Sequence, residues 1–345
     1  MSKAAELAAL IGSQSALSNR NLIINGAFQV AQRGTSATVS DNSNEGYSTL
    51  DRWFVNFNNS VGGGVTFSQS TDTPSGFANS LKIQCSNADS VGSTNEYVGV
   101  RQLIEAQNLQ MLGYGTSAAK SMTLSWQMKA DNYTGPISVQ FKTADGTAEY
   151  YVKSYTPTSS WATYTCTVPG STSATINDDN GEGMRVQFTL AGHTGSSIAA
   201  SSDSTAWSTT RADYRDNIGN LLSNTSNAIY ITGVQLELGE QATPFEHRSF
   251  GDELARCQRY FQDYTTDRFR HQQGYAESGT AYARDVLIPQ MRANPTVTVS
   301  DENRNGFDAI SAAGNAPHRV DFTANCTVTG TSRFYDFKFT ADAEL

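Results

Sequence analysis

The sequence predicts a mainly β protein built around a β-sandwich. Two observations predict it: short segments in which apolar and polar residues alternate, and clusters of turn-forming residues between them. Of the 345 residues, 38% are hydrophobic, only 17% are charged and 28 are glycine. A chain with few charges and many polar turn formers is typical of short strands joined by tight connections, rather than of helices rich in Glu and Lys.

The alternation is clearest in the middle of the chain. Residues 122–128, 137–141 and 184–190 each place apolar side chains on one face and polar side chains on the other. Such strands suit antiparallel sheets with one solvated side. Turn clusters such as 62–64 and 178–181 separate the runs, and no long helical pattern intervenes. We therefore expect two packed antiparallel sheets over residues 21–248.

The N-terminal segment, residues 1–20, is predicted to contain one short amphipathic helix. Ala4, Leu7 and Ile11 recur at helical spacing, and Leu10 lies beside them. A helix of a few turns is marginal alone, because its nucleation is costly. We therefore expect Leu7, Leu10 and Ile11 to pack against the protein's own globular part or against other chains.

A smaller domain with a helix followed by strands is expected over residues 249–345. Ser249 and Asp252 fit a capping box, and the apolar residues from Leu254 to Tyr264 recur at helical spacing. Segments with strand-like patterns follow the helix: 285–288, 296–299, 319–322, 326–328 and 334–339.

Charge and composition argue against several classes of protein. The net charge of −9 argues against a nucleic-acid groove, which needs clustered Lys and Arg. No apolar run approaches the roughly 20 residues of a membrane span, so we expect no membrane insertion. The four cysteines form no C-x-x-C pair and are expected to be reduced core residues.

Both ends of the middle segment resemble a known family. At the start these are residues 21–28 (NLIINGAF), 32–34 (QRG) and 51–53 (DRW), and at the end residues 231–246 (ITGVQLELGEQATPFE) and 253–260 (ELARCQRY). These segments resemble phage tail-fibre and virion-appendage proteins, whose jelly-roll is similar to that of carbohydrate-binding modules. The resemblance implies a jelly-roll form of the predicted sandwich.

The resemblance also implies a virion structural protein, usually a homotrimer, that is assembled in the host cytoplasm and meets the host surface. Residues 1–20 would then dock on other virion proteins or hold the trimer together, with Leu7, Leu10 and Ile11 as the docking residues. Jelly-rolls also serve as lectins, shells and enzymes, so the resemblance alone does not establish sugar binding.

A host-surface glycan, if bound, is expected to contact the loop at residues 206–215. Trp207, Arg211 and Tyr214 combine aromatic planes, on which sugar C–H faces pack, with a polar group that can bond hydroxyls. The alternative is that Trp207 plugs the end of the sandwich. Tyr150-Tyr151 and residues 269–271 are weaker candidates.

No metal, cofactor or catalytic residue is expected. Asp301 to Gly306 matches the start of an EF-hand loop, but Ala312 stands where the bidentate acid belongs, so a turn between Val299 and Ile310 is the better interpretation. Asp51 and Glu237 are expected to accept hydrogen bonds within the sandwich, with a structural calcium site as the alternative. The four histidines are isolated, and no G-x-S-x-G motif occurs.

These observations predict a non-enzymatic tail-fibre or appendage subunit that contributes to attachment at a host-surface glycan. Two alternatives stay open. One is a capsid-attached decoration or fibre protein that binds no sugar. The other is a free protein that binds or hydrolyses carbohydrate.

Overall fold

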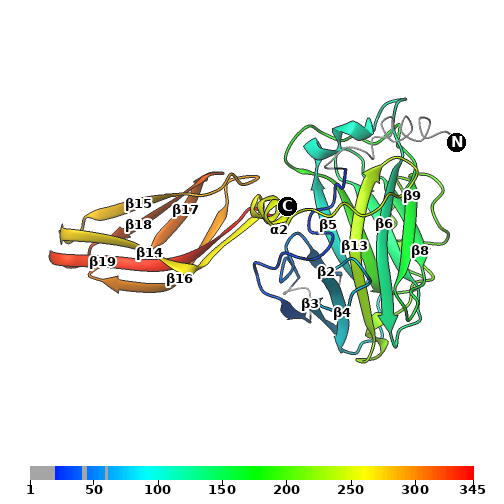
Figure 1. The fold of residues 1–345 in the computed structure, drawn as a ribbon, viewed down its shortest axis with the longest axis horizontal. Coiled ribbons are helices and arrows are strands. Elements are labelled where there is room, and N and C mark those ends of the chain that lie inside the picture. The colour runs from blue at the N-terminus through cyan, green and yellow to red at the C-terminus, as the bar shows by residue number, and fades with distance from the viewer. Residues whose placement is uncertain (1–19, 41–44, 59–60) are drawn as a thin grey trace. The chain divides into compact units, whose positions relative to one another are not determined.

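The structure, a computed structural model, describes residues 20–40, 45–58 and 61–345 (Figure 1). The described residues confirm the predicted mainly β fold and form two compact units that divide between Glu253 and Leu254. The predicted N-terminal helix, with Leu7, Leu10 and Ile11, lies outside the described residues. Within those residues, no helix has the length and apolar character needed to cross a membrane.

The first unit is a jelly-roll sandwich of two antiparallel sheets. The six-stranded sheet has the order β1 (Ser36–Val39), β3 (Gly64–Ser70), β4 (Ser80–Asn87), β13 (Ala228–Leu238), β6 (Met122–Asp131) and β9 (Ala162–Val168). The five-stranded sheet has the order β2 (Phe54–Asn58), β5 (Tyr97–Glu105), β10 (Glu182–Gly192), β7 (Ile137–Thr143) and β8 (Tyr150–Tyr155).

Short elements complete this unit. The parallel pair β11 (Ala199–Ala200) and β12 (Tyr214–Arg215) lies in the connection from β10 to β13. Two 3-10 helices, η3 (Ala106–Leu112) and η4 (Leu221–Ser223), join strands of the sandwich.

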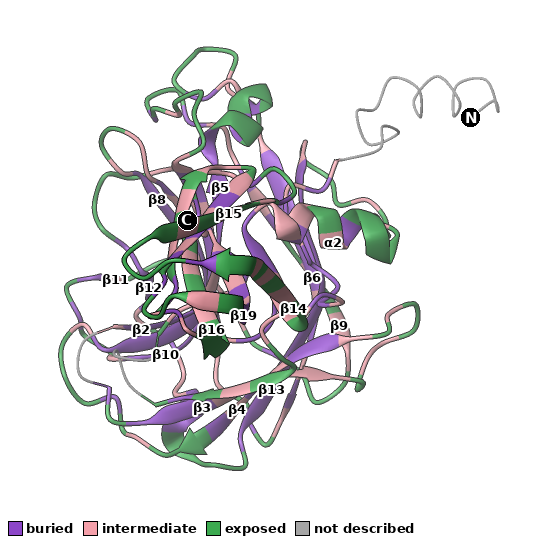
Figure 2. Cartoon of the chain, turned by 90° about the vertical axis from the view of Figure 1, so that its left-hand side faces the viewer, coloured by how far each residue is buried: buried purple, intermediate pink, exposed green. Residues whose placement is uncertain are grey.

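The core of the sandwich lies between the inner faces of the two sheets. Trp53 packs its ring 5.1 Å from Phe28 and 6.4 Å from Phe188, and Phe188 lies 5.5 Å from Trp126. All four rings are at most 2% exposed. Figure 2 colours the buried residues purple, and they lie along the strands of both sheets. The alternation seen in the sequence therefore directs one side-chain row of each strand inward.

The sequence pattern predicts two strands, 229–231 and 234–238, where the structure has the single strand β13 with a bulge between them. Its register with β6 shifts between Thr232 and Gln235, where Gly233 takes a φ of 62°. A Cβ atom on Gly233 would come within 2.7 Å of the Phe77 ring. Glycine therefore fits here both for its left-handed backbone and for the close ring.

The apolar run Leu22-Ile23-Ile24 predicts a first strand from the sequence, but residues 21–24 form no strand. The Leu22 amide donates to the Leu236 carbonyl at 2.8 Å, but both backbone groups of Ile24 bond the side-chain amide of Gln102 at 2.8 Å. Asn25 then turns with a φ of 58°. The Leu22 amide and the Asn21 side chain thus join this segment to β13, while the Gln102 side chain of β5 satisfies the backbone of Ile24.

Arg248 holds this opening segment to the connection after β13. Its guanidinium donates to the carbonyls of Asn21 at 2.5 Å and Ile23 at 3.1 Å, and lies 3.4 Å from Glu246 and 3.5 Å from Glu253. We call these five residues the Arg248 cluster. The segments that resemble virion appendages therefore meet in space and join the start of the sandwich to its end.

The second unit begins at Leu254, within α2 (Phe250–Gln258), and contains two three-stranded sheets. One has the order β14 (Phe261–Ala276), β19 (Gly330–Asp342) and β16 (Thr296–Asn305). The other has the order β15 (Ala281–Leu287), β18 (Arg319–Asn325) and β17 (Ser311–Ala316). Phe322, Phe337 and Phe339 meet in the core of this unit, with ring centroids 4.3 to 6.3 Å apart.

Two sequence-based predictions in this unit were wrong in extent. The helix begins as predicted, since the Asp252 amide donates to the Ser249 hydroxyl at 3.2 Å, but it ends at Gln258. Tyr264 lies in β14 and stacks on Phe339 at 4.6 Å, so pairing with a distant strand overrides the local helical spacing. Residues 301–305 likewise continue β16 through a bulge rather than forming a turn.

Candidate functional site

A polar pocket lies in the sandwich, beside the edge strand of the five-stranded sheet. Its volume is about 410 Å³, and it is lined by Tyr150 of β8 and by residues between Ser197 and Ala212, Trp207 not among them. Five serines and two threonines contribute to the lining, whose charged side chains are Asp203 and Arg211. Many hydroxyls around a single aromatic ring make a wall suited to a polar ligand with a flat apolar face.

Backbone pairing along β8 fixes one wall of the pocket. Tyr150 and Ser208 exchange backbone hydrogen bonds of 2.8 and 3.1 Å. Val152 accepts from the Ser204 amide at 2.9 Å and donates to the Ser204 hydroxyl at 3.0 Å. The loop therefore occupies the free edge of β8, which would otherwise expose unpaired backbone groups.

An ion pair fixes the other wall. Asp203 accepts from the Ser154 amide at 3.1 Å and from Arg215 Nε at 2.6 Å. The Arg215 amide donates to the Ser138 hydroxyl of β7 at 2.9 Å, which ties the loop to the sheet. Because both walls are bonded to the sheet, the pocket is formed before any ligand arrives, which lowers the entropy lost on binding.

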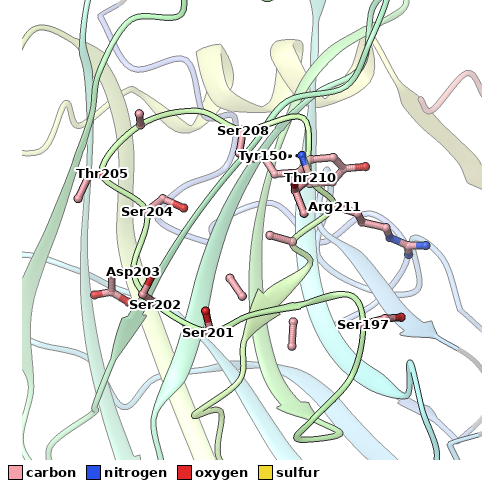
Figure 3. Close-up of a pocket in the computed structure, with 14 residues that line it drawn as sticks. Tyr150, Ser197, Ser201, Ser202, Asp203, Ser204, Thr205, Ser208, Thr210 and Arg211 are labelled. Carbon is pink, nitrogen blue, oxygen red and sulfur yellow. Dashed lines mark hydrogen bonds between the residues drawn. The ribbon is translucent and has the colours of Figure 1, made fainter.

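Tyr150 and Arg211 lie together at one side of the pocket, with Asp203 and Thr205 opposite them (Figure 3). The Arg211 side chain is 52% exposed and pairs with Asp213 at 2.5 Å. Burial, and next the charge of Asp213, raise the pKa of Tyr150, so its hydroxyl is protonated at neutral pH and can donate a hydrogen bond. This side of the pocket thus offers a ring, a donor hydroxyl and a cation.

The structure does not bring the three predicted glycan contacts together. Arg211 lines the pocket, but Trp207 packs its half-buried ring between Tyr114 and Tyr151, at 5.8 and 5.9 Å. The indole N–H of Trp207 donates to the Pro169 carbonyl at 2.6 Å. Trp207 therefore has the plugging position that was the alternative interpretation of its sequence context.

Tyr214 is a core residue. It is fully buried, its ring lies 5.7 Å from that of Tyr97, and its hydroxyl donates to the His193 carbonyl at 2.8 Å. Its ring presents no face to solvent, because strand β12 turns it inward. The composition of a loop does not show which of its side chains are exposed. For this reason the sequence grouped Tyr214 with Arg211.

The sequence did not predict the polar lining of the pocket. Tyr150 was only a weaker candidate, and Asp203 and the serines of 197–208 carried no motif. The run of Ser, Ala and Thr in 196–210 is the signal that the sequence offered, since a long polar loop between two strands is where binding residues concentrate.

No cluster of three or more potential metal ligands occurs in the part of the chain that the structure describes. Asp51 accepts from the Gln32 amide at 2.7 Å and from its side chain at 3.0 Å. Glu237 accepts from the Thr243 amide at 2.8 Å and from its hydroxyl at 2.6 Å. Both acids have the hydrogen-bonding role expected of them, and all four cysteines are free and buried.

Comparison with known proteins finds likeness in solved structures only. No family model and no curated protein matches the sequence. The enzymatically active domain of tailspike protein 4 of bacteriophage CBA120 is 14% identical, with a TM-score of 0.33 over 64% of this chain and 21% of that one.

Two carbohydrate-related structures are similar to the same extent. A putative sugar-binding protein from Bacteroides thetaiotaomicron is 14% identical, with a TM-score of 0.34 over 63% of this chain and 99% of that one. The family 11 carbohydrate-binding module from Clostridium thermocellum, in complex with a β-1,3-1,4-mixed-linked tetrasaccharide, is 14% identical, with a TM-score of 0.31 over 61% and 98%. The likeness lies in the fold alone.

Proposed function

We propose that this protein is a non-enzymatic subunit of a virion appendage, such as a tail fibre, and that its sandwich binds a host-surface glycan in the pocket beside Tyr150. The observation that carries the glycan proposal is the pre-formed pocket itself. It combines seven hydroxyl side chains with one aromatic ring and one half-exposed cation, Arg211.

The chemistry of this pocket suits sugar recognition. A pyranose ring has C–H faces that pack on an aromatic plane and hydroxyls that both donate and accept hydrogen bonds. Tyr150, which is 9% exposed, is the one aromatic side chain of the lining, while serine and threonine hydroxyls can act in either sense. Ordered water can bridge the remaining distances, at an entropic cost of about 0–2 kcal/mol for each water.

The carboxylates of the pocket favour binding over hydrolysis. Glycoside hydrolysis commonly uses two carboxyl groups that face the scissile bond from a set separation. Asp203 is the one carboxylate in the lining, and Arg215 already holds it at 2.6 Å. The lining therefore lacks a matched acid and base.

The virion role is supported by the sequence resemblance and by the structural use of the same segments. Four members of the Arg248 cluster, at positions 21, 23, 246 and 253, lie within stretches that resemble appendage proteins. Those stretches thus act as scaffold rather than as a reaction centre. A capsid-attached decoration with no sugar binding shares this scaffold, and a free carbohydrate-binding protein shares the pocket.

A glycan array with the labelled full chain tests the binding proposal. We expect retention of a defined set of glycans, and loss of retention in Ser202→Trp, which fills the pocket from an exposed position of the loop. Tyr230→Ala is the control, since Tyr230 lies on β13 in the other sheet and also carries a lysine, Lys82, over its ring at 5.6 Å. Retention by Ser202→Trp equal to that of the wild type would contradict the site.

Three measurements test the virion role and the reaction class. Native mass spectrometry should give a trimer, and removal of residues 1–18 should abolish incorporation into particles; a monomer, or normal incorporation, would count against the proposal. Incubation with bound glycans should release no new reducing ends, and their appearance would favour the hydrolytic alternative.

A further inference from the structure

We infer that the glycan is anionic, because a row of cations on the outer face of the five-stranded sheet runs into the pocket. This inference rests on the proposed glycan binding and specifies its substrate class, a sugar that carries carboxylate or sulfate groups. The row consists of Arg101 on β5, Arg185 on β10, Lys142 on β7 and Arg211 of the loop.

Strand register places these residues side by side. Lys142 is directly opposite Arg185, and on its other side Lys142 is opposite Tyr150 of β8. Arg101 is opposite Gln187, two residues from Arg185 on the same strand. The neighbours of these cations along each strand, such as Phe141 and Val186, belong to the core, so the cations occupy the outer face.

The row continues into the pocket. The Lys142 ammonium lies 5.7 Å from the centre of the Tyr150 ring, which lines the pocket. Arg211 lines the pocket beside Tyr150, and its charge acts on Lys142. A ligand on the Tyr150 ring would therefore lie between two cations from different elements.

Only part of this positive charge is neutralised within the protein. Arg185 forms a two-bond pair with Glu182, at 2.6 and 2.9 Å, and Arg211 pairs with Asp213. Within the described residues, neither Lys142 nor Arg101 has a carboxylate oxygen at ion-pair distance. Arg101 instead bonds the Asn56 amide oxygen at 2.8 Å and lies 4.3 Å from the centre of the Phe54 ring.

The cations of this row repel one another, and the carboxylates of Glu182 and Asp213 offset only part of the repulsion on Lys142. Like charges directly opposite on neighbouring strands destabilise a sheet. Burial, followed by the charge of Arg185, lowers the pKa of Lys142, and the same two causes in the same order lower the pKa of Arg101. A bound carboxylate or sulfate would offset this repulsion. The repulsion is local, because the chain as a whole has a net charge of −9.

The test compares an anionic glycan with its neutral counterpart. We would titrate the full chain with a uronic-acid oligosaccharide, with the same oligosaccharide after reduction of its carboxyl groups, and with a sulfated oligosaccharide of equal length. We expect at least one anionic form to bind roughly tenfold more tightly than the neutral form. This factor is the affinity anticipated from one charge-assisted hydrogen bond, which the neutral form cannot make. Binding should weaken as salt is added.

Lys142→Gln tests whether Lys142 binds the anionic group of the glycan, and Lys82→Gln is its matched control. Both lysines are half-buried strand residues with the ammonium over a tyrosine ring, at 5.7 and 5.6 Å, but Lys82 lies on the other sheet. We expect Lys142→Gln to remove most of the preference for the anionic form and Lys82→Gln to leave it unchanged.

The outcomes separate this inference from the proposed function. Equal binding of neutral and anionic forms, with no effect of salt or of Lys142→Gln, would overturn the inference and leave glycan binding standing. Failure of every glycan on the array, neutral or charged, would overturn both. The salt dependence of the wild-type protein keeps the test valid even if Lys142→Gln does not fold.

Discussion

Arg248→Met tests whether the segments that resemble virion appendages act as the structural junction of the sandwich. The Arg248 side chain is 6% exposed, and its carboxylate partners Glu246 and Glu253 are 12% and 11% exposed. Methionine keeps the apolar stem but removes the charge and the bonds to the carbonyls of Asn21 and Ile23.

The expected loss follows from removing the Arg248 cation from two carboxylates that are at most 12% exposed. Breaking a buried ion pair by removal of one partner costs about 3–5 kcal/mol. Each carboxylate retains an amide donor, Asn21 N–H at 2.8 Å for Glu246 and Asn25 N–H at 2.5 Å for Glu253. We therefore expect a decrease in the free energy of unfolding near the lower end of that range, about 3 kcal/mol.

Urea unfolding followed by tryptophan fluorescence measures this loss in the right unit, since all four tryptophans, Trp53, Trp126, Trp161 and Trp207, lie before the division at Glu253. Lys129→Gln is the control. Lys129 also contacts two carboxylates, those of Asp72 and Asp131, but these are 44% and 43% exposed, so its loss should cost at most about 1 kcal/mol. Equal losses in the two variants would refute the reasoning.

Three further predictions concern the sandwich. Trp207→Ala should lower the free energy of unfolding by about 2–4 kcal/mol and leave glycan affinity unchanged, because the ring plugs the core. Unchanged stability in denaturation together with lost affinity in glycan titration would return Trp207 to the binding site. Gly233→Ala should lower the thermal midpoint more than Gly239→Ala, because both glycines have positive φ but only Gly233 faces the Phe77 ring; equal midpoints would contradict the clash.

Asp51→Asn should flatten one part of the pH profile of stability. Burial raises the folded-state pKa of Asp51 above 3.8, so the unfolded chain releases this proton first as pH rises. Stability contributed by the protonated group is therefore lost as pH rises through the folded-state pKa. The difference between wild-type and variant midpoints should change as pH rises above about 4, and parallel profiles would contradict this.

Local patterns predicted the strands of the sandwich well, because alternation records which side chains face the core. Residues 122–128 and 184–190 lie within β6 and β10. The same logic failed at Tyr264, whose apolar spacing fits a helix as well as a strand and whose conformation is decided by β19, about 75 residues away. It failed at residues 22–24 because the Gln102 side chain, distant in sequence, satisfies their backbone.

The candidate site was predictable only in part, for a related reason. Arg211 could be named because the loop at 206–215 concentrates polar and aromatic residues. The row of cations could not, because Lys142 and Arg185 are 43 positions apart and become neighbours only through the register of β7 and β10. Sequence composition reports what a loop contains, whereas pairing decides what lies beside it.

A crystal structure of the full chain with a bound anionic oligosaccharide tests the central claim most directly. The account predicts sugar density on the Tyr150 ring, with a carboxylate or sulfate group within hydrogen-bond distance of Lys142 or Arg211. Density on the opposite sheet, over Tyr230 and Lys82, or within residues 254–345, would contradict it.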